Sequence, residues 1–365
     1  MTIDPYVLRL TRLRAVVADA GLDAVLISQP ENRTYLSGFT GSAGWLLVLA
    51  DAALFATDFR YYEQVGLECP DFELVKLPAG LQEALPGLVE RIGGRKLGFE
   101  ADHATFAEVE EWRTGLTACE WVPTKGLTRD LRAVKDGAEV TLIRAAVKIA
   151  DEALAAALAE VRPGMRERDL SWLIESYMHA RGADGPAFET IVACGPNGAR
   201  PHARVSDAPL TLGEPIVIDM GARLGGYCSD LTRTVCLGQP ADPGRFWEIY
   251  NTVLRAQIAA QSAVRPGMGG LQIDGIARDA ITEAGYGEQF GHGLGHGVGL
   301  AVHEEPRLAR TNATEALVPG HVVTVEPGIY LPGWGGVRIE DIILVTDDGA
   351  EVLTTAPKNP IISIS

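Results

Sequence analysis

Residues 216–234 read IVIDMGARLGGYCSDLTRT and place an acid, Asp219, at the end of an apolar strand. The polar stretch ARLGG predicts the tip of a hairpin with an even loop centred on Leu224 and Gly225. That register puts Asp219 directly opposite Asp230, and two like charges facing each other on one face of a sheet destabilise it. A bound cation is therefore the first candidate for what compensates this acid pair.

The composition is that of a globular protein whose main partner is not a nucleic acid. The chain has 365 residues, 47% of them hydrophobic, which suggests about two domains. Forty-eight acids against 32 bases give a formal net charge of −16. Such a charge argues against nucleic acid or an anionic membrane as the main partner.

The ends and the cysteines predict a cytoplasmic protein. The first residues, MTIDPYVLRL, carry an acid where a secretory signal needs bases, and no later run reaches the roughly 18 apolar residues of a membrane span. The cysteines show no CxxC spacing and are odd in number, so neither a disulfide framework nor a thiolate metal site is expected. They are Cys69, Cys119, Cys194, Cys228 and Cys236.

Alternating strand and helix signals predict an N-terminal α/β domain over residues 1–130. Residues 131–365 follow as a second domain, entered through a charged connector and a long helix. VRPGM occurs there at 161–165 and again at 264–268, each time after an Ala-rich helical segment and before a second helical segment. The two copies predict a duplicated half-domain, with a cleft on the pseudo-twofold axis that relates the halves.

A second pair of acids occurs near the C-terminus in VEPGIYLPGWGGVRIED. If this stretch is a hairpin with an odd loop, Leu331 pairs with Gly335 and Glu326 falls opposite Glu340. Arg338 shares a face with Glu340 by strand alternation, so a simple ion pair is the alternative for that end. One arginine cannot neutralise four acids.

The stretch GHGLGHGVGLAVHEEP adds His292, His296 and His303 among glycines that let the backbone approach a ligand closely. Isolated histidines such as His103, His179 and His321 are more often surface or satisfied core residues. HxxxH also occurs in structural zinc sites, but those normally close with Cys or His, whereas the partners here are acids. The run therefore indicates metal or substrate ligands.

Four carboxylates with one or two imidazoles form a hard, oxygen-rich set that suits Mn²⁺, Co²⁺ or catalytic Zn²⁺. Four negative charges match two divalent ions. A pair of metals about 3.5–4 Å apart can share a water, lower its pKa and polarise a carbonyl. The sequence thus predicts a two-metal hydrolytic site, with Mn²⁺ as the first choice and Co²⁺ or Zn²⁺ as alternatives.

The ordered ligand set resembles the metal pentad of the methionine aminopeptidase and Xaa-Pro peptidase superfamily, peptidase family M24, whose catalytic domain is called the pita-bread fold. Its members here are Asp219, Asp230, His296, Glu326 and Glu340. The N-terminal domain with DFRYYEQ resembles that of Xaa-Pro aminopeptidases, prolidases and creatinases. Creatinases share the fold without the pentad, so five intact ligand types favour a metallopeptidase.

The resemblance implies a role for each ligand. Asp219 would chelate one metal, His296 and Glu326 the other, and Asp230 and Glu340 would bridge both. A bridging hydroxide would attack the scissile carbonyl, and Glu326 would carry its proton to the leaving proline nitrogen.

Three further histidines match those of Xaa-Pro peptidases that bind the scissile carbonyl and the prolyl residue and stabilise the oxyanion. They are His202 in GPNGARPHARVSD, His292 and His303. The implied reaction is hydrolysis of the bond before proline, whose nitrogen carries no hydrogen.

The finer alternatives are an Xaa-Pro dipeptidase, or prolidase, and an aminopeptidase P that acts on longer peptides. A dipeptide presents a free carboxylate on its proline, which calls for a cation. Arg307 in VHEEPRLAR matches an arginine at that place in archaeal-type prolidases, and Arg338 is a second substrate-binding candidate. The plainer interpretation of Arg307 is an ion pair with Glu304 or Glu305.

Family members are commonly homodimers, so Arg33 and Arg60 of the N-terminal domain could reach over the cleft of a partner subunit; the sequence leaves open whether either does. Two other classes of function stay open. One is a non-catalytic peptide-binding module on the same fold, although no ligand position is substituted. The other is a hydrolase of a different amide or ester, including an organophosphate triester, because a metal-bound hydroxide does not by itself choose its electrophile.

Overall fold

The computed structural model describes residues 4–78, 80–81, 84, 87–88, 96–311 and 313–364. The chain forms two compact units that divide between Arg132 and Ala133. Within the described residues, none of the helices is both long enough and apolar enough to cross a bilayer.

The first unit is built on a mixed sheet of strand order β4-β3-β2-β1-β5-β6. Its strands are β1 (Ala24–Ile27), β2 (Trp45–Leu49), β3 (Ala53–Thr57), β4 (Glu73–Lys76), β5 (Lys96–Glu100) and β6 (Glu120–Thr124). Its described helices are α1 (Pro5–Asp19), α2 (Pro30–Ser37), α3 (Tyr62–Glu68), α5 (Phe106–Gly115) and α6 (Arg129–Ala133), the last of which ends one residue into the second unit.

Of the two arginines that could reach a partner subunit, Arg33 does not project from the first unit. Its side chain is buried, and Nη1 and Nη2 donate to the carbonyl oxygens of Gly44 and Gly41 at 2.9 and 3.1 Å. It clamps the loop before β2. Arg60 is exposed and forms an ion pair with Asp58 at 2.8 Å.

The second unit consists of two similar halves, as the repeated VRPGM predicts. The first half-domain runs from α7 to β12 and contains α7 (Gly137–Glu160), α8 (Glu167–Ala180), η1 (Gly195–Ala199), β7 (Gly185–Pro186), β8 (Ile191–Cys194), β9 (Pro215–Met220), β10 (Ala222–Leu224), β11 (Tyr227–Cys228) and β12 (Leu231–Leu237). Strands β8, β9 and β12 form one sheet, to which β20 (Ile361–Ile362) is added.

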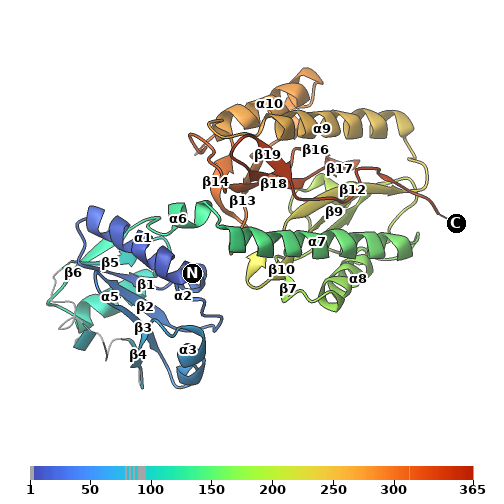
Figure 1. Ribbon diagram of the computed structural model, residues 1–365. Helices are drawn as coiled ribbons and strands as arrows, with labels where there is room; N and C mark the ends of the chain where they lie inside the picture. Colours follow the sequence, from blue (N-terminus) through green and yellow to red (C-terminus); the bar gives the residue numbers. More distant parts are fainter. Residues whose placement is uncertain are drawn as a thin grey trace. The chain divides into compact units, whose positions relative to one another are not determined.

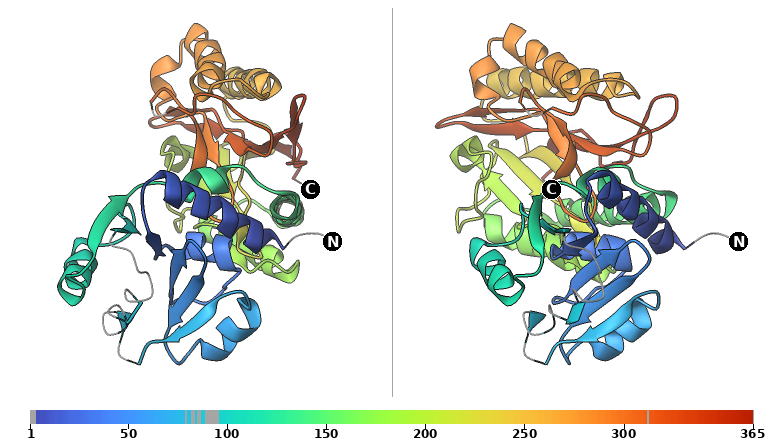
Figure 2. Two further views of the ribbon diagram at one scale, coloured as in Figure 1. Left: turned by 60° about the vertical axis from the view of Figure 1, so that its left-hand side comes forward. Right: turned by 90° about the vertical axis from the view of Figure 1, so that its left-hand side faces the viewer.

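The second half-domain runs from α9 to β19. It contains α9 (Pro243–Ala263), α10 (Gly270–Glu283), η2 (Gly287–Gln289), β13 (Gly295–Gly297), β14 (Glu304–Leu308), β15 (Val322–Val325), β16 (Gly328–Leu331), β17 (Gly335–Arg338), β18 (Asp341–Val345) and β19 (Ala350–Val352). Strands β9, β12, β17 and β18 lie between α9 and α10 on one side and α7 and α8 on the other (Figures 1 and 2).

The two VRPGM segments have the same local structure. Each follows a long helix directly, and Gly164 and Gly267 both have φ of +83°, a left-handed conformation that glycine adopts at little cost. Each segment leads into a second helix in which the side chain of the third residue accepts from the backbone N–H of the N-cap residue. Asp169 accepts from Arg166 at 3.3 Å in one half, and Gln272 accepts from Gly269 at 3.0 Å in the other. The internal repeat of the sequence is therefore a repeat of structure.

The hairpin that carries Asp219 and Asp230 turns one residue later than predicted. Gly225 and Gly226 both have positive φ, +56° and +81°, as a two-residue type I′ turn requires. The hairpin is therefore centred between these glycines, and Asp219 pairs with Thr232. Asp230, two residues before Thr232, becomes a diagonal neighbour of Asp219 on the same face.

The second hairpin has the predicted register. Leu331 pairs with Gly335 in β16 and β17. The same register continues at Val325 and Asp341 in β15 and β18, so Glu326 falls opposite Glu340.

Candidate metal centre

The five predicted ligands come from two sheets of the second unit, the one that contains β9 and β12 and the one that contains β13, β15 and β18. Asp219 is the penultimate residue of β9, and Asp230 directly precedes β12. His296 is the middle residue of β13, while Glu326 follows β15 and Glu340 precedes β18. The first half-domain thus supplies two carboxylates, and the second supplies two carboxylates and an imidazole.

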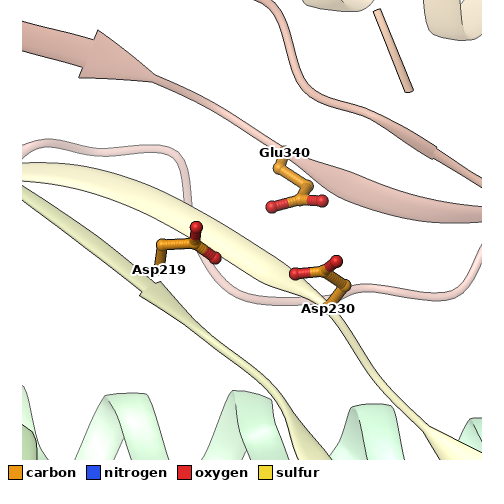
Figure 3. A group of neighbouring side chains, drawn as sticks. All are labelled: Asp219, Asp230 and Glu340. Carbon is orange, nitrogen blue, oxygen red and sulfur yellow. The ribbon is translucent and has the colours of Figure 1, made fainter. Parts of the chain in front are cut away.

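Three of the carboxylates point toward one another (Figure 3). One oxygen from each of Asp219, Asp230 and Glu340 lies within 4.8 Å of the other two. His296 extends this group, because its Nε2 lies 3.7 Å from Oδ2 of Asp230 and 3.2 Å from Oε1 of Glu326. All five predicted ligands therefore belong to one cluster.

The cluster has a strong excess of negative charge. Burial raises the pKa of Asp230 well above its usual value, and the neighbouring Glu340 and Asp219 raise it further. The pKa of Glu340 is likewise raised, by burial and by the charges of Glu326 and Asp219. Without a cation these acids tend to hold protons, since several buried carboxylates cannot all ionise close together.

The side chains present fit a divalent cation. Oδ1 of Asp219 and Oε1 of Glu340 are buried, and neither has a hydrogen-bond partner within the described part of the chain. Buried acceptors without partners are costly unless an ion or water satisfies them. Nδ1 of His296 lies 3.1 Å from the carbonyl oxygen of Gly297, a contact that leaves Nε2 free to bind a metal.

Two buried threonines that sequence reasoning missed hold the ligands in place. Oγ1 of Thr232 donates to Oε2 of Glu340 at 2.6 Å. Oγ1 of Thr324 donates to Oε1 of Glu326 at 3.1 Å and accepts from the backbone N–H of His296. Each threonine lies two residues from a predicted ligand, on the same strand face, and that spacing is the signal that could have identified it.

Arg338 contacts Asp219, whereas the sequence suggested Glu340 as its ion-pair partner. Its Nη2 lies 2.6 Å from Oδ2 of Asp219. Nε donates to Oγ1 of Thr232 at 3.0 Å, and Nη1 donates to the hydroxyl of Tyr330 at 2.7 Å. The guanidinium is buried, and each of its nitrogens has a partner within the protein.

Tyr330, also missed from the sequence, connects Arg338 to His292. Nε2 of His292 lies 3.1 Å from the Tyr330 hydroxyl, and Nδ1 lies 2.8 Å from the carbonyl oxygen of Gly293. Burial lowers the pKa of His292. A neutral ring that donates from Nδ1 and accepts from the tyrosine satisfies both contacts.

The other predicted residues lie at the exposed side of the cluster. The ring of His303 lies 4.2 Å from that of His296, measured between centroids. Arg307 pairs across the strands with His296, and its side chain is 44% exposed. His202 is exposed, and its charge acts on His303.

The two ion pairs considered for Arg307 have different outcomes. Glu304 lies 2.8 Å from the buried Nζ of Lys135. Glu305 lies 3.9 Å from Nε of Arg307, at the limit of an ion pair. Arg307 is therefore held loosely, and its side chain is about half exposed to solvent.

Comparison with known proteins places both units in described families. Residues 141–347 match Metallopeptidase family M24, and residues 9–134 match the Creatinase/Prolidase N-terminal domain. The chain is 39% identical over 348 residues to an Xaa-Pro dipeptidase of Pyrococcus furiosus, with 95% of this chain and 97% of that protein covered.

Several solved structures resemble the whole chain, and two of them show the range of activities. An Xaa-Pro dipeptidase from Bacillus anthracis superposes with a TM-score of 0.94 at 41% identity, covering 98% of this chain and 100% of that one. An X-Pro aminopeptidase from Thermotoga maritima superposes with a TM-score of 0.89 at 36% identity, covering 97% and 99%. The similarity therefore extends to both kinds of Xaa-Pro peptidase.

Proposed function

This chain belongs to metallopeptidase family M24 and is a metal-dependent peptidase, and from that premise we propose that it hydrolyses Xaa-Pro dipeptides. The observation that carries the proposal is the convergence of four carboxylates and one imidazole from two half-domains. The names of the relatives support the substrate class.

Two divalent cations are the proposed cofactors. Asp219 would hold one, His296 and Glu326 the other, and Asp230 and Glu340 would bridge them. When bound there, such ions lower the pKa of a water and polarise the scissile carbonyl. Mn²⁺ is the proposed metal because the ligand set is rich in hard oxygen donors. A homodimer in the cytoplasm is proposed with it, on the family resemblance and the sequence alone.

The remaining residues would orient and protonate the substrate. Glu326 would carry a proton to the proline nitrogen, which needs one to leave as an amine. His303 and His202, exposed beside the ligand cluster, would contact the scissile carbonyl as its charge develops. His292 would support the site indirectly, through its contact with Tyr330, since both its ring nitrogens already have partners.

Arg307 supports dipeptides over longer peptides as the substrate. It is a half-exposed cation on the strand next to His296, and its own carboxylate neighbour is only weakly engaged. An arginine there would bind the free carboxylate that only a dipeptide carries on its proline. Arg338 was the other candidate for this role, but its contacts favour the support of Asp219 instead.

The deciding experiment compares hydrolysis of Ala-Pro and Ala-Pro-Ala by metal-stripped protein reloaded with Mn²⁺. Cleavage confined to the dipeptide is the expected result. Faster cleavage of the tripeptide would make the protein an Xaa-Pro aminopeptidase and remove the proposed role of Arg307. Tight peptide binding without metal-dependent cleavage would instead identify a binding module.

A further inference from the structure

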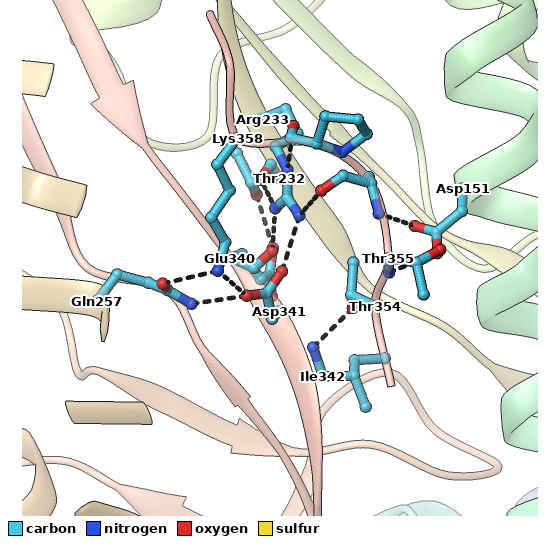
Figure 4. A network of polar contacts seen from close by, with 12 residues as sticks. Asp151, Thr232, Arg233, Gln257, Glu340, Asp341, Ile342, Thr354, Thr355 and Lys358 are labelled. Carbon is cyan, nitrogen blue, oxygen red and sulfur yellow. Dashed lines mark hydrogen bonds and ion pairs between the residues drawn. The ribbon is translucent and has the colours of Figure 1, made fainter. Parts of the chain in front are cut away.

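Behind the ligand cluster, a short C-terminal segment, Thr354–Lys358, is bonded to both half-domains (Figure 4). On the side of the first half-domain, Asp151 of α7 accepts from the backbone N–H and the hydroxyl of Thr355 at 2.7 and 2.6 Å. On the side of the second, the backbone N–H of Ile342 donates to Oγ1 of Thr354 at 3.0 Å. The segment therefore joins the two halves.

Arg233 of β12 is the centre of this network. Its side chain is 2% exposed. Nη1 donates to the carbonyl oxygens of Thr232 and Glu340, Nη2 donates to that of Ala356, and Nε donates to that of Pro357. A single guanidinium thus holds backbone from the first half-domain, from the second, and from the C-terminal segment.

Asp341 and Lys358 balance and orient Arg233. Oδ1 of Asp341 accepts from Nη2 of Arg233 at 2.8 Å, and Oδ2 accepts from Nε2 of Gln257 at 2.9 Å and lies 2.5 Å from Nζ of Lys358. Gln257 comes from α9, so the network also reaches the helix layer of the second half-domain. Both oxygens of the buried carboxylate are engaged.

The network adjoins two of the proposed metal ligands in the sequence. Asp341 directly follows Glu340, and Arg233 lies three residues after Asp230. The backbone N–H of Glu340 also donates to the carbonyl oxygen of Thr232 at 3.1 Å. Glu340 of the second half-domain is therefore held by Thr232 and Arg233, which follow Asp230 in the first half-domain.

Stability alone does not account for such a network. A buried ion pair is often no more stabilising than apolar side chains of the same volume, because both charges must leave water. A fork of five donors does, however, fix the geometry of the groups it contacts. The network lies next to Asp230 of one half-domain and Glu340 of the other, and this location indicates that it controls the distance between the two carboxylates.

We propose that Arg233 is a positioning residue for the metal centre. Held by Asp341, Lys358 and the segment Thr354–Lys358, it sets where Glu340 lies relative to Asp230. The proposal rests on the proposed function, in which these two carboxylates bridge the metals. The proposal states that Arg233 affects binding of the second metal ion, the one that completes the pair in a titration, more than binding of the first.

The test is Arg233→Lys, which keeps the charge and removes the fork. Mn²⁺ titration by calorimetry should show a first site close to wild type and a second site weakened about 10-fold or more, the usual effect of losing an outer partner of a ligand. Electron paramagnetic resonance should show isolated Mn²⁺ in place of a coupled pair. At saturating Mn²⁺, kcat for Ala-Pro should fall while KM stays near wild type.

Lys358→Met is the second variant, in case Arg233→Lys does not fold. It removes one partner of Asp341 and leaves Arg233 in place, so the second site should weaken in the same direction by a smaller factor. Arg144→Met is the matched control. It breaks an exposed pair with Glu351 that also joins the two half-domains, and such pairs contribute little, so both sites should stay as in wild type.

Wild-type affinity for both metals in folded Arg233→Lys would overturn the proposal, and so would the same result in Lys358→Met if the first variant does not fold. A wild-type protein that binds no coupled pair of metals would instead overturn the two-metal site of the proposed function. The two failures are thus distinguished by the wild-type titration.

Discussion

Nη2 of Arg338 lies 2.6 Å from Oδ2 of Asp219, so a buried guanidinium from one half-domain holds a carboxylate of the other. The charge of Arg338 lowers the pKa of Asp219 against the larger, opposite effect of burial. Asp219 is thereby kept closer to the ionised form that a metal requires.

Replacing this guanidinium should weaken metal binding before it changes the fold. We expect Arg338→Met to lower kcat/KM for Ala-Pro by about 10- to 100-fold, as the loss of an outer partner of a metal ligand usually does. Mn²⁺ affinity, measured by calorimetry, should fall in parallel. Tyr330→Phe, which keeps the contact with Asp219, is the comparison and should be less affected. Full Mn²⁺ affinity in Arg338→Met would contradict this role.

Asp230→Asn should abolish turnover while the protein stays folded. The substitution removes a proposed bridge, so we expect activity to fall by about 100-fold or more. It also removes one of several mutually repelling carboxylates, so the melting temperature of the metal-free protein should not decrease. Thermal unfolding with and without Mn²⁺ checks both points. Unchanged activity with Mn²⁺ would rule out the two-metal assignment.

Arg307→Met should discriminate between substrates with and without a free carboxylate. KM for Ala-Pro should rise about 10-fold or more, because a charge-assisted hydrogen bond to the proline carboxylate is lost. KM for the amide of Ala-Pro, which lacks that carboxylate, should change little. Equal effects on both substrates would assign Arg307 to its contact with Glu305 instead.

His321 should make the protein less stable in acid. Burial, together with the charge of Lys135, lowers the pKa of His321 to about 4, whereas in an unfolded chain it is about 6.5. Between these values the unfolded chain binds the extra proton. The free energy of unfolding therefore falls as the pH falls through this window, by up to about 1.4 kcal/mol per pH unit for this group.

His321→Asn tests this effect with little change in packing. Nδ1 of His321 accepts from the backbone N–H of Val318 at 3.3 Å, and an asparagine oxygen offers an acceptor at a similar place. Melting temperatures of the metal-free proteins at about pH 5 and about pH 7 should differ less in the variant than in wild type. An identical pH dependence would show that His321 takes no part.

The sequence predicted which side chains lie together better than it predicted the strand register that brings them together. Strand alternation was enough to bring Glu326 and Glu340 to the same place, because the loop between β16 and β17 has the predicted centre. The first hairpin was misplaced because the turn falls on two consecutive glycines with positive φ, one residue beyond the predicted centre. Moving the turn by one residue shifts the cross-strand pairing by two residues, so Asp219 and Asp230 still share a face of the sheet.

The partners of long side chains were the least predictable feature. Arg33 was one of two candidates to reach a partner subunit, yet its guanidinium donates to carbonyl oxygens of its own loop. The partner of Arg338 comes from a strand more than a hundred residues away in sequence, and no local pattern indicates it. Such contacts depend on how the two half-domains pack, which spacing along one strand does not determine.

Neither half-domain holds all five of the proposed ligands, since one supplies Asp219 and Asp230 and the other His296, Glu326 and Glu340. If the chain were divided between β12 and α9 and the fragments made separately, each alone would be an inert protein of ordinary composition. Peptide cleavage would return only on reassociation. Activity therefore requires both half-domains to be folded and associated, and damage to one half abolishes the activity of the whole.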